Sequence, residues 1–320
     1  MNKHIKTWLI IAVSLILAGC VVFVCVMSSL NWDFTKISTF KFTTNTHTVS
    51  ETYANIDITT AEANVELIPS QDNETRVVCF EKTTIKHSVC VENNTIVISV
   101  VDNRQWYDYI GFSFTSPKVT VYLPQGSYEG ITVKSGTGNV NIPEAYSFNS
   151  MDISVGTGAV TSLAKTESIK VKSGTGNVRV KNSEGAVEVS TATGNIELCN
   201  VNSAADIKLN VATGNVSVRD VVCNNFTTDS STGSINLSNV IATGKMSITA
   251  STGNVKFDKC DASQIYVKTS TGNVGGTLLT HKNFKASSDT GAVAVPPSIL
   301  TAGLCEITVS TGNIKISIAE

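Results

Sequence analysis

A Thr-Gly dipeptide with Val or Ile two residues after the glycine recurs ten times after residue 131, and this repeat constrains the fold more than any other feature of the chain. Successive glycines are 18 to 21 residues apart. Self-similarity at this period is typical of architectures in which each copy forms one supersecondary unit and neighbouring units stack. The ten glycines are Gly138, Gly158, Gly176, Gly194, Gly214, Gly233, Gly253, Gly272, Gly291 and Gly312.

Apolar residues stand at fixed offsets from each glycine. Two residues after it, every copy has Val or Ile, and seven residues before it, every copy has an apolar residue. The apolar positions −7 and −5, and again +2 and +4, have a period of two, which is typical of strands and excludes helix. The phase of this alternation changes at the Thr-Gly pair. Each copy is therefore expected to be a strand, a corner and a second strand, since glycine tolerates the backbone angles of a sharp corner.

A single copy cannot bury its apolar face alone, so we expect successive copies to stack with their strands in parallel. The predicted fold is all-β, a single-stranded parallel β-solenoid (β-helix) of about ten coils over residues 126–320. At a strand spacing of about 4.8 Å, ten coils form a rod roughly 45 to 50 Å long. Stacking also predicts ladders along the rod, formed by the threonines before the glycines and by the asparagines that follow seven of them.

An uncharged segment near the N-terminus is long enough to cross a bilayer. Residues 7–30 carry no charge, whereas residues 1–6 contain Lys3 and Lys6. About 20 apolar residues span the hydrocarbon core, and Lys and Arg are enriched on the cytoplasmic side. We expect one transmembrane signal-anchor helix, with residues 1–6 in the cytoplasm and the rest outside. Lipidation at Cys20, which ends a Leu-Ala-Gly-Cys sequence, is the alternative, although the sequence beyond it stays apolar.

Two segments separate the anchor from the repeats. Residues 31–50 are rich in Thr, Ser and Asn and suit a spacer. Residues 51–125 contain short alternating apolar runs, which predict irregular first coils or an antiparallel cap over the first apolar layer. Five aromatic residues in this segment form either a surface that binds sugars or a membrane, or a seal on the solenoid end. They are Trp106, Tyr107, Tyr109, Phe112 and Phe114.

Two of the eight cysteines are candidates for a disulfide. Cys79 and Cys90 flank a predicted hairpin in a domain expected outside the cell, where oxidation is allowed. No Cys-x-x-Cys spacing occurs. Most of the other cysteines are expected to be small buried apolar residues.

No pattern of catalytic, cofactor-binding or metal-binding residues is recognisable. Gly136-Thr-Gly138 lacks the third glycine and the following helix of a nucleotide-binding loop. The four histidines lie in unrelated contexts, so neither a histidine metal site nor a Ser-His pair is expected. The formal charge is −2 and no Lys/Arg cluster occurs, which argues against a nucleic-acid partner. We therefore expect no enzyme and no cofactor.

Several motifs resemble a known family. They are the segments 53–58, 65–69 and 119–126 and the Ser-Gly-Thr-Gly-Asn-Val repeats that begin at Ser135. Their order over about residues 50–320 is similar to that of the bacterial putative-adhesin family of β-strand repeat proteins, long catalogued as a domain of unknown function. The resemblance implies an exported, membrane-attached, right-handed β-solenoid. It carries no catalytic or binding residues, and the adhesin label is itself an inference from shape.

The features together favour a non-enzymatic protein of the bacterial cell surface. Its long rigid face is expected to bind a glycan, a cell-wall polymer or a protein. The alternatives are an accessory or sensor protein of the envelope stress response and, more remotely, a β-helix enzyme similar to polysaccharide lyases. We also expect weak end-to-end self-association through the closing strand 314–318, since open strand edges recruit other strands.

Overall fold

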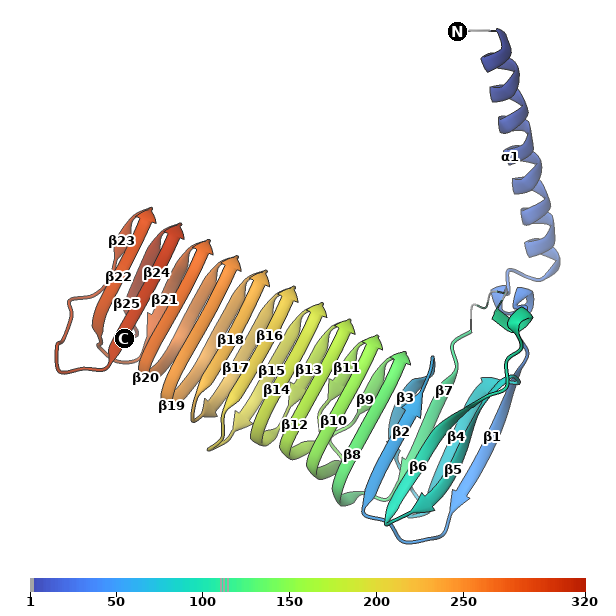
Figure 1. Ribbon diagram of the computed structural model, residues 1–320, viewed down its shortest axis with the longest axis horizontal. Coiled ribbons are helices and arrows are strands. Elements are labelled where there is room, and N and C mark those ends of the chain that lie inside the picture. The colour runs from blue at the N-terminus through green and yellow to red at the C-terminus, as the bar shows by residue number, and fades with distance from the viewer. Residues whose placement is uncertain (1–2, 110, 112, 114) are drawn as a thin grey trace.

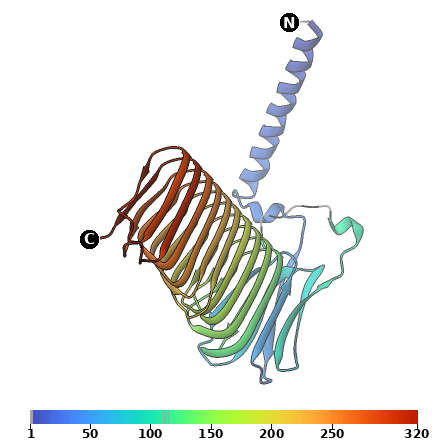
Figure 2. The same ribbon diagram turned by 60° about the vertical axis from the view of Figure 1, so that its left-hand side comes forward.

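The repeats form the predicted all-β parallel solenoid (Figure 1). A computed structural model describes residues 3–109, 111, 113 and 115–320. In each coil a long first strand ends at the Thr-Gly pair and a second strand follows it, and both pair in parallel with their counterparts in the neighbouring coil. Equal offsets are in register, so Thr157 pairs with Thr137 on one side and with Thr175 on the other. Figure 2 shows the resulting stack of coils.

The strands of the ten Thr-Gly copies fall into two stacks, and in the middle coils one strand continues from one stack into the next. The first strands are β8 (Gly126–Thr137), β10 (Tyr146–Thr157), β12 (Lys165–Thr175), β14 (Ser183–Thr193), β16 (Ile207–Thr213), β18 (Phe226–Thr232), the later parts of β19 (Ile235–Thr252) and β20 (Val255–Thr271), β22 (Asn283–Thr290) and β24 (Leu304–Thr311). The second strands are β9 (Val140–Ile142), β11 (Val160–Ser162), β13 (Val178–Lys181), β15 (Ile196–Asn202), β17 (Val216–Cys223), the first parts of β19 and β20, β21 (Val274–Leu278), β23 (Val293–Ala294) and β25 (Ile314–Ile318).

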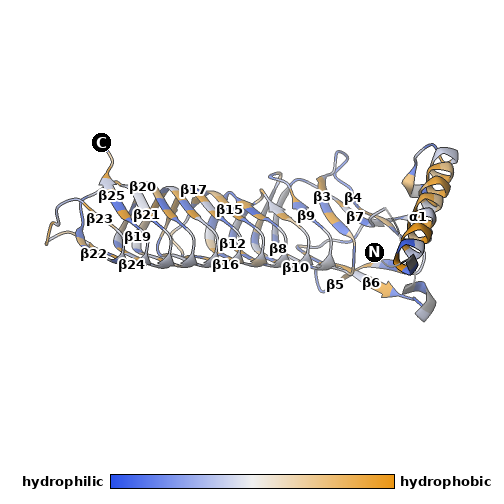
Figure 3. Cartoon of the chain, turned by 90° about the horizontal axis from the view of Figure 1, so that it is seen from above, coloured by the Kyte–Doolittle hydropathy of each residue, from blue (hydrophilic) through white to orange (hydrophobic). Residues whose placement is uncertain are grey.

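The core is a column of apolar side chains at the predicted inward offsets. Ile207 and Val216, at −7 and +2 of one coil, are almost fully buried, whereas Lys208 between them is exposed. Burial of apolar area contributes about 25 cal/mol per Å². The alternation of inward and outward residues is therefore confirmed for this coil, and Figure 3 shows hydrophilic and hydrophobic segments interspersed along the rod.

The Thr-Gly corner requires glycine for two reasons. The ten corner glycines have φ between +139° and +151°, a region that residues with a Cβ avoid. A Cβ on Gly194 would also lie 2.0 Å from the carbonyl oxygen of Gly176 in the preceding coil. The asparagine ladder next to these glycines runs from side chain to backbone: Oδ1 of Asn195 accepts the N–H of Asn215 at 2.8 Å.

The middle coils have a second corner that the sequence analysis did not anticipate. Six residues after the glycine, five consecutive coils have a residue in the left-handed region, with φ between 52° and 59°. Asparagine and aspartate tolerate this conformation because their short side chains hydrogen-bond locally. The five residues are Asn182, Asn200, Asp220, Asn239 and Lys259.

The last two coils do not stack in sequence order. Strand β24 of the final coil pairs with β20 on one side and with β22 on the other, and β25 likewise lies between β21 and β23. The coil of Gly312 is therefore inserted between those of Gly272 and Gly291. This corrects the expectation that the strand 314–318 forms the open edge, because that edge belongs to β22 and β23. End-to-end association stays a prediction for this other edge.

Two further coils precede the ten copies. Strands β2 (Asn55–Thr60) and β3 (Asn64–Pro69) pair in parallel with β8 and β9. On their other side, β6 (Thr95–Asp102) pairs with β2 and β7 (Lys118–Leu123) pairs with β3.

The N-terminal end of the stack is closed by antiparallel strands. Strand β5 (Ile85–Glu92) pairs with β6, β4 (Thr75–Lys82) pairs with β7, and β1 (Phe42–Val49) pairs with β4. Residues 51–125 are thus both first coils and antiparallel cap.

One helix projects from the capped end. Helix α1 (Lys3–Ser29) is followed by the 3-10 turn η1 (Phe34–Ile37) and then by β1. Among the described residues, the one helix long and apolar enough to cross a membrane is His4–Ser29. Figure 1 shows it directed away from the solenoid, and Figure 3 shows apolar residues along its length.

Candidate functional site

The outward side of the first strands forms a continuous surface along the rod, which we call the polar face. It consists of the side chains at offsets −6, −4 and −2 from each corner glycine. Offset −2 is Gly, Ala or Ser in nine of the ten copies, with Asp289 as the exception. The side chains at −6 and −4 are Thr132, Lys134, Asp152, Ser154, Lys170, Lys172, Glu188, Ser190, Lys208, Asn210, Thr227, Asp229, Ser247, Thr249, Tyr266, Lys268, Lys285, Ser287, Glu306 and Thr308.

Three shallow depressions follow one another along the polar face. A depression of about 560 Å³ in the middle is lined by Ser190, Asn210 and Asp229, with small residues at −2 as its floor. Another of about 550 Å³ lies over β2, β8, β10 and β12. A third of about 200 Å³ lies over β19, β20 and β24. The depressions thus lie over successive coils but at different offsets, −4 and −2 in the middle one, −8 and −6 in the second and −6 and −4 in the third.

Charges on the polar face alternate from coil to coil. In the strand register, Asp152, Lys170, Glu188 and Lys208 are successive neighbours at offset −6. Lys170 Nζ lies 2.9 Å from Glu188 Oε2. This hydrogen bond raises the pKa of Lys170 and lowers the pKa of Glu188. Opposite charges side by side leave the face without a strong field of either sign, so its contacts with a ligand would be mainly local hydrogen bonds.

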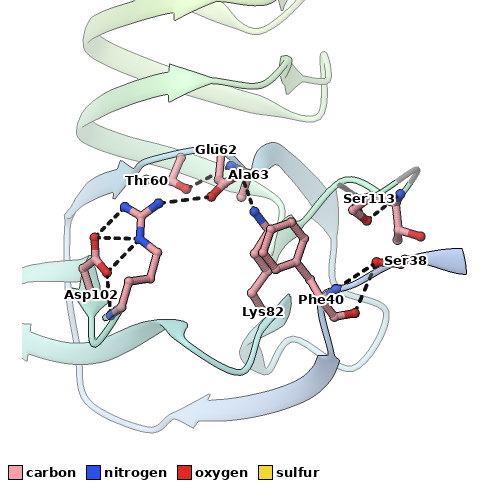
Figure 4. A network of polar contacts seen from close by, with 10 residues as sticks. Ser38, Phe40, Thr60, Glu62, Ala63, Lys82, Asp102 and Ser113 are labelled. Carbon is pink, nitrogen blue, oxygen red and sulfur yellow. Dashed lines mark hydrogen bonds and ion pairs between the residues drawn. The ribbon is translucent and has the colours of Figure 1, made fainter. Parts of the chain in front are cut away.

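A second polar site lies at the capped end, between the Thr60–Asn64 corner and the chain after η1 (Figure 4). Glu62 forms an ion pair with Lys82, with 2.7 Å between Nζ and Oε2, and its Oε1 lies 3.9 Å from the Arg104 guanidinium. Lys82 also lies 4.4 Å from the centre of the Phe40 ring. Hydrogen bonds from Arg104 lower the pKa of Asp102 to about 2. A depression of about 430 Å³ adjoins these residues, and Glu62 in its lining already pairs with Lys82 and Arg104.

The aromatic cluster lies in an enlarged corner of the outermost N-terminal coil. Twenty-one positions separate Ile98 from Val119, whereas seven separate Ile58 from Val65 in the next coil. The insertion contains the 3-10 turn η2 (Trp106–Tyr109), in which Trp106 is 77% exposed. The alternative in which the cluster seals the solenoid end is therefore wrong for Trp106, because β1, β4 and β5 cover that end.

The other members of the predicted aromatic surface are less defined. Tyr107 and Tyr109 belong to η2, but their side chains lie outside the described part of the structure. Phe112 and Phe114 lie outside the described residues altogether. Of the five, Trp106 is the one whose side chain is described, and it is exposed.

The predicted disulfide does not form. Cys79 is buried on β4 and Cys90 is exposed on β5, and both are free. The two cysteines are apart because the strands on either side of the turn belong to different stacks. Strand β4 pairs with β7, whereas β5 pairs with β6. Cys223 and Cys305 are buried as expected, and burial raises the pKa of each thiol to about 12.

A buried polar cluster joins the cap to the first coils. Glu81 and His87, on either side of the β4–β5 turn, are 1% and 6% exposed. Glu81 Oε2 lies 2.7 Å from His87 Nδ1 and accepts the His87 backbone N–H at 2.7 Å. Cys79 lies beside them, and the three potential ligand atoms are within 4.8 Å of one another. Sequence reasoning missed this cluster, although Cys79-x-Glu81 on one strand shows that both side chains share a face.

The fold defines this protein as an all-β parallel solenoid of stacked coils with an apolar N-terminal helix. A model of the Toastrack DUF4097 family matches residues 53–210 and 202–320, and the chain belongs to this family. The family has no established function. No curated protein matches the chain.

Solved structures with a similar arrangement are distant in sequence. A putative adhesin from Bacteroides fragilis is 16% identical, with a TM-score of 0.38 over 87% of this chain and 97% of that chain. A putative adhesin from Parabacteroides distasonis is 14% identical, with a TM-score of 0.38 over 87% and 98% of the two chains. A putative lipid binding protein from Parabacteroides distasonis is 11% identical, with a TM-score of 0.33 over 88% and 98%.

Proposed function

We propose that this protein is a non-enzymatic, membrane-anchored surface protein whose polar face binds an extended, hydrated polymer of the cell envelope. The observation that carries the proposal is the composition of that face. Of the twenty side chains at −6 and −4, only Tyr266 carries a large ring, and the rest are Ser, Thr, Asn, Lys, Asp and Glu. Hydroxyls, amides and paired charges suit a ligand rich in hydroxyl groups.

The shape of the face supports an extended ligand over a compact one. The three depressions are shallow and lie along the rod axis over successive coils, so a chain-like molecule would contact several of them in turn. Parallel pairing of all the coils fixes the spacing of these contacts. A rigid face binds with less loss of conformational entropy than a flexible one.

Helix α1 supports attachment to the membrane. Its apolar residues are exposed, apart from Met27 near its end, and Lys3 and Lys6 lie at its N-terminal end. The enrichment of Lys on the cytoplasmic side of membrane proteins favours a topology in which the solenoid is outside. Protease added to intact cells should then degrade the chain beyond Asp33, whereas protection of the solenoid would reverse this topology.

The binding proposal is tested by filling the central depression. Asn210→Trp places a bulky ring in the depression lined by Ser190 and Asp229. Asn236→Trp is the matched control, because Asn236 is exposed on the second-strand side of the rod. We expect the full-length protein in detergent to bind isolated envelope polysaccharide, and Asn210→Trp to weaken binding at least about tenfold, close to 1.4 kcal/mol.

The control decides how the result is interpreted. Asn236→Trp should bind as the unmodified protein does. Equal binding by both variants, or no binding of envelope polysaccharide by the unmodified protein, would contradict the proposal.

A further inference from the structure

We propose that Cys79, Glu81 and His87 bind a divalent transition-metal ion, and that Zn²⁺ is the ion this set of ligands fits best. The three side chains are buried, and one ligand atom from each lies within 4.8 Å of the other two. A thiolate, a carboxylate and an imidazole are the three ligand types that Zn²⁺ takes in proteins. The sequence analysis expected no metal site because the histidines stand apart from one another in the chain.

Strand geometry brings the three ligands together. Cys79 and Glu81 are two residues apart on β4, so they point to the same inward side. The chain turns after Lys82, and His87 then points inward from β5. The Glu81 Oε2 and His87 Nδ1 atoms are already 2.7 Å apart. An ion would replace the hydrogen bond between them, and a modest separation of the two side chains would accommodate it.

The remaining atoms of the ligands are held by hydrogen bonds. Asn45 Nδ2 donates to Glu81 Oε1 at 2.6 Å. Thr60 Oγ1 lies 3.1 Å from His87 Nε2. Metal-binding histidines and carboxylates are characteristically oriented by such outer contacts, which leave one atom of each group for the ion. Here those atoms are Oε2 and Nδ1.

Charge and space also suit a divalent ion. The Cys79 thiolate and the Glu81 carboxylate together carry two negative charges, so the buried set with Zn²⁺ is neutral. Binding releases the thiol proton to solvent. A cavity of about 10 Å³ adjoins Glu81, His87 and Thr60, which is close to the room that one water needs. A water there would complete a four-ligand shell.

The position of the site gives the ion a structural role. Cys79 and Glu81 belong to β4, His87 belongs to β5, and Thr60 belongs to β2 of the adjoining coil. Strands β4 and β5 pair with different neighbours, β7 and β6. An ion held between them would therefore join the two stacks of the cap above the first coils.

The test uses the full-length protein in detergent, stripped of metal with a chelator and titrated with Co²⁺ and then with Zn²⁺. Thiolate coordination to Co²⁺ gives a charge-transfer band in the near ultraviolet. We expect one equivalent to produce this band, Zn²⁺ to abolish it, and Zn²⁺ to raise the melting temperature through preferential binding to the folded state. Cys79→Ser should remove the band.

Two further variants keep the test decisive if Cys79→Ser fails to fold. Cys305→Ser is the matched control, since Cys305 is also a fully buried cysteine but lies in the final coil, away from the cluster. It should keep the band. Thr60→Val removes the contact to His87 Nε2 and should weaken Co²⁺ binding about tenfold or more. Absence of the band in the unmodified protein, or its persistence in Cys79→Ser, would overturn the proposal.

Discussion

At the scale of single residues, backbone conformation at the corners decides whether a coil can stack on its neighbour. The corner glycines combine a positive φ with close approach to the preceding coil. The second corner of the middle coils also needs a left-handed residue, but it has space for a side chain, so asparagine and aspartate serve there. These two corners impose different demands, and substitutions at each should have different effects.

The first demand is tested by Gly194→Ala and Gly126→Ala. Both glycines have a positive φ, of 140° and 156°, so both variants incur a backbone cost of about 1 to 3 kcal/mol. A Cβ on Gly194 also meets the Gly176 carbonyl oxygen at 2.0 Å, whereas nothing lies within 4 Å of a Cβ on Gly126. Gly194→Ala should therefore lose about 1 to 3 kcal/mol more stability. Equal melting temperatures would contradict the close stacking of the corners.

The left-handed conformation at the second corner predicts a stabilising substitution at Lys259. Its φ of 52° disfavours lysine, whereas the equivalent Asn239 and Asp220 in the two preceding coils are joined by a 2.9 Å hydrogen bond. Lys259→Asn should raise the free energy of unfolding by about 0.5 to 1 kcal/mol. Lys256→Asn, at an exposed position of strand β20, is the control and should lower the free energy of unfolding slightly because asparagine is a poor strand former. The melting temperatures of both variants test this prediction. A lower melting temperature for Lys259→Asn than for the unmodified protein would contradict it.

At the scale of strands, equal offsets are stacked, so a residue type repeated or alternated along the sequence becomes a ladder in space. The charges at −6 on β10, β12, β14 and β16 form such a ladder, with Lys170 and Glu188 in contact. Their side chains are 40% and 44% exposed, so the energy of the contact is small and screened by salt. The contact nevertheless predicts how the stability of the protein changes with pH in acid.

Lys170→Gln tests this ladder through the stability of the protein in acid. Lys170 lowers the pKa of Glu188 below its ordinary value of 4.5, so the ionised carboxylate stabilises the fold above that pH. This contribution is lost as the pH falls through the lowered pKa of the folded state. The unmodified protein should therefore lose more stability than Lys170→Gln on acidification from neutral pH to below pH 4.5, at low salt. Parallel stability curves would show that the pair contributes nothing.

The order of the last coils is tested by engineered disulfides. Lys268 pairs with Thr308 across β20 and β24, whereas stacking in sequence order would place Lys268 beside Ser287. Neighbouring strands are about 4.8 Å apart, within disulfide range, and strands two apart are not. The exposed pair Lys268→Cys and Thr308→Cys should cross-link on mild oxidation in a Cys90→Ser background. The pair Lys268→Cys and Ser287→Cys should not cross-link. The reverse result would show that the last coils stack in sequence order.

Strand periodicity could be predicted from the sequence, but coil order could not. The apolar offsets specify inward side chains, and they do so equally well for the coils of Gly291 and Gly312, where Phe284 and Cys305 both fit the core. The coil of β2 and β3 could be predicted only as an irregular coil or a cap strand, because Ala63 replaces the corner glycine, although Ile56 and Val65 keep the apolar offsets. The site at Cys79 and His87 depends on tertiary contacts between strands of different stacks. No spacing in the sequence reports such contacts.

At the scale of the whole molecule, the rod has a different closure at each end. Antiparallel strands β1, β4 and β5 cover the N-terminal coil, on the side from which α1 departs. At the other end, the chain after β23 returns over β22. There the Ser298 hydroxyl accepts the Phe284 N–H and donates to the Phe284 carbonyl. The N-terminal end is thus covered by paired strands, whereas β22 and β23 keep an edge that pairs on one side only, which is where end-to-end association is predicted.

The central claim is that this face binds one extended polymer along its length. The ten coils that form the polar face, about 4.8 Å apart, give it a length of about 43 Å. The most direct measurement is the affinity of the full-length protein for fragments of isolated envelope polysaccharide graded by chain length. Affinity should rise with fragment length and level off once a fragment spans about 43 Å, the length of ten coils, and Asn210→Trp should weaken binding of the long fragments most. Equal affinity for the shortest and longest fragments would contradict an extended binding face.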